Sequence, residues 1–348
     1  MFLVTECLTW TPFLSPSRTV AGLFTIDSDF KYVVVRKITE GGMGMVYEAE
    51  QQGTQGFVKR VAIKVIRQKF AEQALFLQNF IGEAKLVADL IHTNIVQTYH
   101  LGESRGTYFI AMELINGVNL EQFASQLTAK RKVLSPQMAV FISSRIVRGL
   151  AYAHAKCDRE GKRLGIVHRD VSFKNVMVAF EGDVKLTDFG IAKAKGLLTD
   201  QEGEVVAGKA DYMSPEQADF KVTDERSDIF SVGVVLAHLL LGQNVFKGVT
   251  SDESIKRILE MPIPDFRTLN SEIDGPLNDI LQKALERNVE KRYQKAEQLL
   301  YDLEHYIYHG GYGPTNETLG KYIRDLFGQG DFSATDDTRG GTIAITRS

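Results

Sequence analysis

The 348-residue chain has little cysteine, almost no excess charge of either sign and no long apolar run. Two cysteines, Cys7 and Cys157, exclude a disulfide framework and favour a reducing compartment. Lys plus Arg number 41 and Asp plus Glu number 44, so the formal net charge of −3 excludes the strongly basic field of a general nucleic-acid binder. The most apolar stretch, Ile229–Leu241, is shorter than the roughly 20 residues that span a bilayer, and it predicts a buried helix.

The beginning of the chain lacks the features of a secretory leader. No Lys or Arg precedes Arg18, and no small-residue cleavage site follows the apolar residues. We therefore expect a cytoplasmic protein without an integral membrane segment. Loose membrane association through residues 1–29 is the alternative. No Cys/His arrangement has the spacing of zinc ligands.

Apolar spacing predicts a β-rich first part and a mainly helical second part, which meet near 113–117. The last stretch, 328–348, is rich in Gly, Thr and Asp and predicts a disordered tail. The expected strands are 32–38, 45–50, 60–66, 95–101, 107–114, 176–179 and 184–187, and the expected helices are 71–91, 120–127, 136–155, 228–241, 277–285 and 296–308.

One carboxylate breaks the apolar stripe of the first expected helix. Glu83 lies three residues after Phe80 and four before Val87, on the same helical face. Because a carboxylate that points into a core is costly without a cation, this position requires a positive partner.

Several motifs are weak singly but specific in their order and spacing. Each of them has an ordinary reading as a turn, a strand or a surface residue when it is taken alone. Together they match the signature set of protein kinases. In sequence order they are the Gly41–Gly44 turn, Val61–Lys64, His168-Arg169-Asp170 with Asn175 five residues after Asp170, Asp188-Phe189-Gly190, and Ser214-Pro215-Glu216.

Over residues 30–308 the chain resembles the bacterial eukaryotic-like (Hanks-type) serine/threonine protein kinases, in a myxobacterial-like subgroup. The resemblance implies a bilobed α+β fold, with a β-rich N-lobe of about 30–114 that carries one long helix and a mainly α-helical C-lobe of about 115–308. Residues 1–29 are then an N-terminal extension. An amphipathic segment, 309–327, is a helical extension that packs on the large lobe or binds a partner.

The same resemblance implies ATP and Mg²⁺ as cofactors. Glycines would let backbone N–H groups approach the phosphates, and Lys64, oriented by Glu83, would hold them. Asn175 and Asp188 would bind the metal ion, which favours oxygen ligands, and Asp170 would accept the proton of the substrate hydroxyl. The full set of implied ATP-binding residues is Gly41, Gly42, Gly44, Val46, Ala62, Lys64, Glu83, Met112, Glu113, Ile115 and Met177.

Four further residues have structural roles in this comparison. His168 and Phe189 resemble members of the packed spine that joins the lobes. Asp228 resembles the helix-borne anchor of the catalytic loop. Glu216 is expected to form a buried ion pair with Arg292, and breaking one partner of such a pair costs about 3–5 kcal/mol.

The chain departs from the kinase pattern at several positions. Thr39 replaces the first glycine of the phosphate loop, and its β-branched side chain is stiffer. Ser172 stands where serine/threonine kinases carry a catalytic-loop lysine, while Lys209 stands where they carry threonine. Lys174 is a second nearby cation. Because the transferring phosphoryl group needs a positive partner, we hypothesise that Lys209 or Lys174 supplies it; the alternative is that both are solvated.

The segment between Asp188 and Glu216 has no Ser, Thr or Tyr from 200 to 208. Glu202 and Glu204 stand where phosphothreonines would be expected. We predict that one of them contacts Arg169 and makes activity weakly dependent on phosphorylation. A solvated acidic loop is the alternative.

These features predict an ATP-dependent kinase that phosphorylates Ser or Thr hydroxyls of proteins in bacterial signalling. A catalytically weak pseudokinase or scaffold is one alternative, which Thr39 and Ser172 favour. A small-molecule phosphotransferase is a second, and the Ser214–Glu216 motif argues against it. Tyrosine specificity is a third, suggested by Lys174. The oligomeric state is left open.

Overall fold

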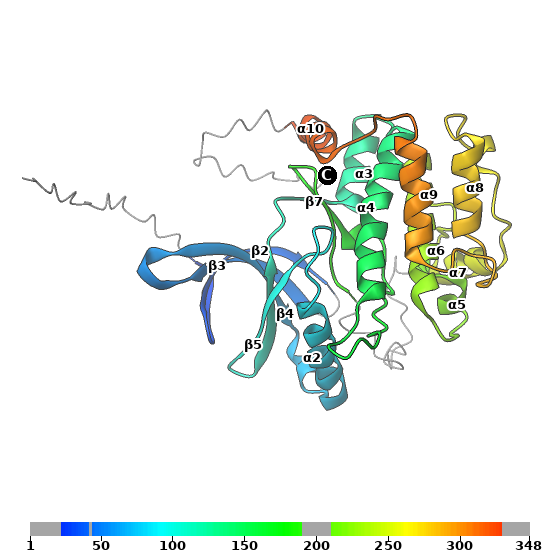
Figure 1. Cartoon of the computed structure of the whole chain (residues 1–348). Helices are drawn as coiled ribbons and strands as arrows, with labels where there is room; N and C mark the ends of the chain where they lie inside the picture. Colours follow the sequence, from blue (N-terminus) through cyan, green and yellow to red (C-terminus); the bar gives the residue numbers. More distant parts are fainter. Residues whose placement is uncertain (1–21, 42–43, 190–209, 329–348) are drawn as a thin grey trace, which may run out of the picture.

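Two lobes make up the part of the chain that the structure, a computed structural model, describes: residues 22–41, 44–189 and 210–328. A curled β-sheet with a long helix forms the small lobe, and helices dominate the large lobe (Figure 1). The lobes meet where β6 (Thr107–Glu113) leads into β7 (Gly117–Asn119). This is the bilobed α+β architecture that the sequence predicts.

The small lobe is built on a six-stranded antiparallel sheet with the strand order β1-β2-β3-β4-β6-β5. One face of this sheet buries Tyr32, Ile63 and Phe109 in a shared core. Helix α2 (Ala74–Ala88) lies against β5 and buries Phe80. The other elements are β1 (Phe24–Asp27), β2 (Lys31–Glu40), β3 (Gly44–Gln52), a 3₁₀ turn (Thr54–Gly56), β4 (Val58–Ile66), α1 (Gln68–Ala71) and β5 (Thr98–Ser104).

Large-lobe helices begin and end at residues that satisfy the free backbone groups. Before α4 (Pro136–Ala155), the Ser135 hydroxyl accepts a hydrogen bond from the backbone of the first turn. Helix α6 (Glu225–Leu241) ends at Gly242, whose φ of 70° is readily available to glycine. The other helices are α3 (Leu120–Ala129), η2 (Phe173–Asn175), η3 (Ala210–Tyr212), α5 (Pro215–Ala218), α7 (Ser251–Glu260), η4 (Phe266–Thr268), α8 (Gly275–Ala284), α9 (Ala296–Tyr308) and α10 (Asn316–Phe327).

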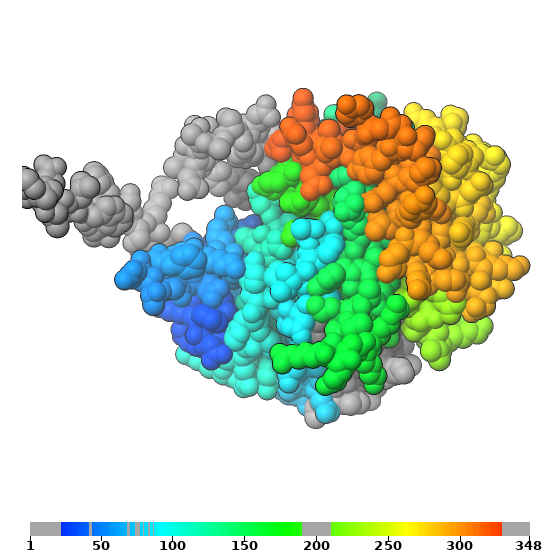
Figure 2. Space-filling view, viewed as in Figure 1, coloured from blue at the N-terminus to red at the C-terminus, as the bar shows by residue number. Residues whose placement is uncertain are grey.

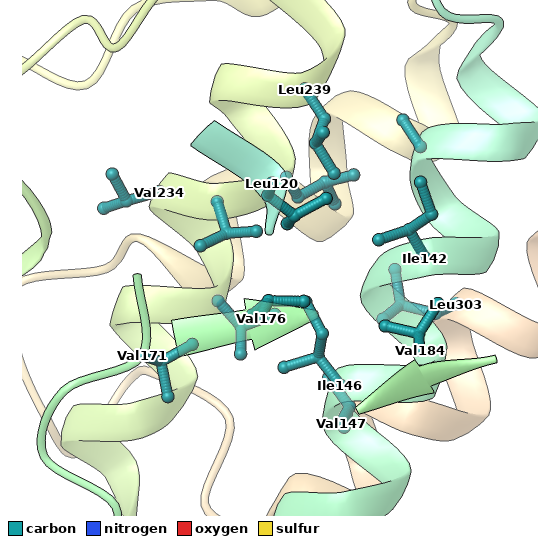
Figure 3. Close-up of a cluster of buried hydrophobic side chains, with 14 of the residues drawn as sticks. Leu120, Ile142, Ile146, Val147, Val171, Val176, Val184, Val234, Leu239 and Leu303 are labelled. Atoms are coloured by element: carbon teal, nitrogen blue, oxygen red, sulfur yellow. The ribbon is translucent and has the colours of Figure 1, made fainter. Parts of the chain in front are cut away.

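A second sheet, with the order β7-β8-β9, includes the strand that directly follows the predicted catalytic loop. Strands β8 (Val176–Ala179) and β9 (Val184–Leu186) place Val176 and Val184 in the core beside α4 and α6 (Figure 3). Val171, inside the loop, enters the same core (Figure 3). Apolar packing thus fixes the middle of the loop and the strand that follows it.

Helix α10 lies against the large lobe, at the red end of the colour scale in Figures 1 and 2. The Arg324 guanidinium donates to the Phe180 carbonyl at 2.7 Å, and the Asn316 amide donates to Asp183 at 2.7 Å. Gly182 has a φ of 97°, and a Cβ at this position would collide with the Asn316 carbonyl. The helix therefore contacts the β8–β9 turn through backbone atoms.

Some elements differ from the sequence-based expectation. Strand β1 lies inside the expected extension 1–29, because buried Ile26 attaches it to the sheet. The expected helix 71–91 is interrupted between α1 and α2. Helix α7 was not predicted, because its apolar stripe is narrow: only Ile255, Ile258 and Leu259 of its ten residues are apolar. No helix among the described residues is long and apolar enough to cross a membrane. Residues 1–21 and 329–348 lie outside the described part.

The close approach at Gly182 gives a stability prediction. We expect Gly182→Ala to lower the free energy of unfolding by about 2–4 kcal/mol, because it combines a strained φ with a collision. Gly161→Ala is the matched control, since Gly161 has a φ of 83° but open space around it. Urea unfolding of both variants measures the difference, and equal losses would contradict the close contact with α10.

Candidate functional site

One face of the small-lobe sheet gathers four of the predicted ATP-binding side chains. Val46 lies opposite Lys64 across β3 and β4, and Ala62 lies opposite Met112 across β4 and β6. Directly opposed residues of antiparallel strands share a face, and so do residues two apart on one strand. The register therefore puts these four side chains on one side of the sheet.

An ion pair connects this face to the large lobe. The Lys64 ammonium lies 2.6 Å from an Asp188 carboxylate oxygen, with the two side chains 17% and 34% exposed. Asp188 follows β9 and has a φ of 58°, in the left-handed region that non-glycine residues rarely adopt. The Glu83 backbone belongs to α2, but its side chain is outside the described side chains. The predicted Lys64–Glu83 pair therefore stays a prediction.

A buried carboxylate holds the predicted catalytic loop. Asp228, fully buried on α6, accepts hydrogen bonds from the backbone N–H of His168 at 2.8 Å and of Arg169 at 2.7 Å. The Asp228 carboxylate also lies 2.9 Å from Nε2 of the buried His154 ring. Burial alone would raise the pKa of Asp228, but the hydrogen bond and charge of His154, together with His168, hold it below its ordinary value. The expected anchoring of the loop by Asp228 is present.

Hydrogen bonds join the remaining predicted active groups. The Asn175 side-chain NH₂ donates to the Asp170 carbonyl at 2.9 Å, and the Asn175 carbonyl accepts from the Thr187 amide at 3.0 Å. Thr187 directly precedes Asp188, so these bonds bring Asp170, Asn175 and Asp188 together. With its NH₂ group engaged, the amide oxygen is the atom of Asn175 that can face a cation.

The spine residues meet between the lobes. The rings of His168 and Phe189 lie 4.5 Å apart. The His168 Nδ1 accepts from the Asp170 amide at 3.2 Å, which leaves Nε2 to donate to the Thr187 carbonyl at 3.0 Å. One imidazole thus fixes the backbone before Asp170 and before Asp188.

The connection between the lobes carries the other predicted ATP contacts. The Glu113 carboxylate pairs with Lys185 of β9 at 2.8 Å, and its backbone amide donates to the Gln97 carbonyl at 2.8 Å. That amide is therefore not available to a ligand. Ile115 follows in the irregular backbone before β7, and half-buried Met177 lies on β8.

Two hollows lie near this connection. A small cavity of about 10 Å³ reaches behind Met112 and is lined by Lys64 and Asp188 among others. A larger open hollow of about 470 Å³ is lined by Ile91, Glu113 and others, and it contains none of the predicted phosphate- or metal-binding residues. We assign the candidate site to the Lys64 side, because the chemistry-bearing groups converge there.

Packing within the sheet requires a glycine in this turn, in addition to the predicted approach of its backbone to phosphates. A Cβ at Gly44 would collide with the Val65 carbonyl of β4, whereas Gly41 has open space around it. The Gly41 amide donates to the Gly44 carbonyl at 2.9 Å, which closes the turn. Thr39 pairs with Val46 at the base of the turn. Gly42 lies outside the described residues.

Segment 210–217 lies beside the catalytic loop and is held by a buried ion pair. Glu216 and Arg292 form two hydrogen bonds of 2.8 and 3.0 Å, and the Ser227 hydroxyl donates to Glu216 at 2.7 Å. Burial alone would raise the pKa of Glu216, but Arg292 and Ser227 hold it below its ordinary value. The Gln217 side chain donates to the Arg169 carbonyl at 3.0 Å. The expected Glu216–Arg292 pair is confirmed.

Comparison with known proteins indicates the same family as the geometry of the candidate site. Residues 32–303 match the family described as protein kinase domain. The chain belongs to the protein kinase family. The resemblance to bacterial Hanks-type kinases is thereby confirmed, since the relatives below are bacterial kinases.

Three comparisons describe what this chain is similar to. It is 34% identical to "Tyrosine-protein kinase MasK" of Myxococcus xanthus, over 95% of this chain and 52% of that protein. It is 34% identical to "Serine/threonine-protein kinase PrkC" of Bacillus subtilis, over 79% of this chain and 40% of that protein. The PknI kinase domain of Mycobacterium tuberculosis has the same fold, with a TM-score of 0.59, 23% identity, and coverage of 79% of this chain and 95% of that chain. The chain thus spans about half or less of the length of these two curated relatives.

Of the two lysines proposed to replace the missing catalytic-loop cation, only Lys174 is among the described residues. Lys174 lies in η2 and is exposed, one residue before Asn175. Lys209 lies outside the described residues, as do Glu202 and Glu204. The choice between the two lysines and the predicted contact of an acidic residue with Arg169 stay predictions.

Sequence reasoning missed an aromatic cluster under the catalytic loop. The rings of Phe173 and His238 stack at 4.0 Å and 8°, and the Tyr212 hydroxyl lies 2.9 Å from the His238 Nδ1. Burial, and secondarily the charge of Lys247, lower the pKa of His238 to about 4. Burial raises the pKa of Tyr212. The available signal was a lone histidine inside the apolar stretch Ile229–Leu241.

The half-buried His238 predicts acid sensitivity. An unfolded His238 takes up a proton near pH 6.5, whereas the folded one does so near pH 4. The unfolded state therefore binds more protons in this window, and this term removes roughly 3 kcal/mol of stability as the pH falls through it. We expect the free energy of unfolding of His238→Phe to lose less over the same range. Parallel slopes for the two proteins in urea unfolding would contradict the assignment.

Proposed function

We propose that this protein is an ATP-dependent protein kinase that transfers the γ-phosphoryl group to Ser or Thr hydroxyls of a protein. The observation that carries the proposal is the convergence of the Lys64 ammonium, the Asp188 carboxylate and the linked Asp170 and Asn175 at the junction of the lobes. Phosphoryl transfer needs positioning and neutralisation of charge more than covalent chemistry, and this set supplies both. Residues 30–308 form the proposed kinase domain.

Each group takes the role that its position supports. Lys64 would bind the phosphates of ATP, with Glu83 as the proposed orienting partner. Val46, Ala62 and Met177 would enclose the adenine, and the backbone at Glu113 and Ile115 would contact its edge. The glycines Gly41, Gly42 and Gly44 would cover the phosphates. Asp170 would accept the hydroxyl proton as the new bond forms.

The donor set fits a magnesium ion. Asp188 offers a carboxylate and Asn175 an amide oxygen, the hard ligands that Mg²⁺ prefers. A bound ion would neutralise the negative charge of the phosphates. No three His, Cys, Asp or Glu side chains gather as a metal cluster within the described ranges, so the phosphate oxygens themselves would complete the coordination.

Tyrosine is the second candidate for the acceptor. MasK, which matches 95% of this chain, is named a tyrosine kinase, and PrkC is named a serine/threonine kinase. Ser172 and exposed Lys174 depart from the serine/threonine pattern at the loop that faces the acceptor. Phosphoamino-acid analysis of a labelled protein substrate separates the two: phosphoserine or phosphothreonine supports the proposal, and phosphotyrosine alone overturns the serine/threonine part.

The biological setting stays part of the proposal. Bacterial relatives support a role in signal transduction, and two cysteines without a disulfide framework are consistent with the cytoplasm. A protein acceptor rather than a small molecule is supported by the ordered Ser214-Pro215-Glu216 motif.

The proposal is tested with purified protein, labelled ATP, Mg²⁺ and a general protein substrate. We expect phosphate transfer that falls about 100-fold or more in Asp170→Asn, because a positioned base contributes 10²–10⁴ in rate. Asp252→Asn, on the exposed start of α7, is the control and should keep the wild-type rate. If wild-type protein binds the nucleotide and transfers no phosphate, the pseudokinase alternative stands instead.

The replacement cation is tested separately. One of Lys174→Ala and Lys209→Ala should lower the single-turnover rate about 10- to 100-fold, because the developing charge on the phosphoryl group loses its partner. Lys256→Ala, an exposed lysine on α7, is the matched control. Wild-type rates in both test variants would remove the hypothesis.

A further inference from the structure

Three aromatic side chains from three separate elements meet beneath the candidate site. Phe173 belongs to η2, between Asp170 and Asn175 in the sequence. Tyr212 belongs to η3, and His238 lies on α6. Besides the stacked pair, Phe173 and Tyr212 lie 5.7 Å apart, and Phe173 is 3% exposed. The cluster therefore connects the catalytic loop to segment 210–217 through the helix that also carries Asp228.

A hydrogen bond joins two members of the cluster. The Tyr212 hydroxyl lies 2.9 Å from the His238 Nδ1, and the tautomer of the imidazole sets which of the two donates. The charged groups that act on this pair are Lys247, near His238, and Asp211 and Glu121, near Tyr212. Asp211 is itself bonded to the Ser254 hydroxyl at 2.7 Å.

The backbone around Tyr212 is held independently of the ring. The Ser231 hydroxyl donates to the Tyr212 carbonyl at 2.8 Å, and the Asn244 amide donates to the Asp211 carbonyl at 2.9 Å. Removing the hydroxyl of Tyr212 thus leaves η3 attached to α6 by other bonds. What it removes is the hydrogen bond to the His238 ring on which Phe173 stacks, whereas the Phe173–Tyr212 ring contact and the Gln217–Arg169 bond stay in place.

We propose that His238 is a positioning residue of the proposed kinase reaction: it forms a hydrogen bond with the Tyr212 hydroxyl, stacks on Phe173, and so sets the distance between segment 210–217 and Asp170. The proposal rests on the proposed function. For its hydroxyl to reach Asp170, a protein acceptor has to lie between these two segments. A change in the distance between the segments misplaces that hydroxyl and lowers the turnover of bound substrate. Lys64, Asp188 and the lobe connection lie outside the cluster, so ATP binding is unaffected.

The test compares Tyr212→Phe, His238→Phe and the double variant. Each single change keeps an aromatic ring at its position and removes one partner of the hydrogen bond between Tyr212 and His238. We expect each to lower kcat for a general protein substrate about tenfold, with the dissociation constant of a fluorescent ATP analogue changed less than twofold. The double variant should be no worse than the singles, because all three lack the same bond.

The exposed stacked pair on α9 provides matched controls. The rings of Tyr301 and His305 lie 6.0 Å apart at 6°, and Tyr301 is 69% exposed. Tyr301→Phe and His305→Phe should keep wild-type kcat. A fall in melting temperature of the Tyr212 and His238 variants with unchanged kcat would overturn the proposal and leave a packing role.

A second measurement does not depend on activity. Hydrogen–deuterium exchange of peptides covering 168–176 and 210–217 should rise together in His238→Phe, although the substitution lies on α6. Unchanged exchange at 168–176 would overturn the positioning role. Absence of phosphate transfer by wild-type protein would instead reject the proposed kinase function, and the exchange result would still decide whether His238 couples the two loops.

Discussion

The candidate site depends first on one carboxylate that has no contact with water. Asp228 is fully buried on α6 and accepts the backbone N–H groups of His168 and Arg169. A buried charge is stable only when hydrogen bonds replace its hydration, and here the loop itself supplies them. The loop backbone is therefore fixed by the same contacts that make the burial of Asp228 tolerable. Asp170 directly follows Arg169, so the same contacts also fix the position of its backbone.

Further contacts join the loop held by Asp228 to the small lobe on one side and to segment 210–217 on the other. Toward the small lobe, His168 bonds the Thr187 carbonyl, which precedes the aspartate that pairs with Lys64. Toward segment 210–217, Gln217 bonds the Arg169 carbonyl, and Phe173 stacks on His238 of the same helix as Asp228. One helix thus supports the groups proposed to hold phosphate and the segment proposed to face the acceptor. The proposed activity needs both to be positioned relative to each other.

Much of the fold followed from local pattern, and the failures have physical causes. Long periodic segments such as Pro136–Ala155 were predicted with their bounds, because a wide apolar face repeats over many turns. Helix α7 was missed because seven of its ten residues are polar, although Ile255, Ile258 and Leu259 stand at helical spacing and pack on the core. Strand β1 was missed because its alternation of apolar and polar residues lasts for only four positions and buries a single side chain, Ile26. Such elements are stabilised by their neighbours rather than by their own pattern.

The chemical groups of the candidate site follow from the amino-acid order: the spacing of Lys64, Asp170, Asn175 and Asp188 indicates phosphoryl transfer. Tertiary structure alone decided how close these groups lie, because they are separated by up to 124 residues and only packing brings them together. It also decided the place of His238, which looks like an ordinary member of an apolar helix. A residue's neighbours across the fold are set by long-range packing and hydrogen bonding, which local spacing does not encode.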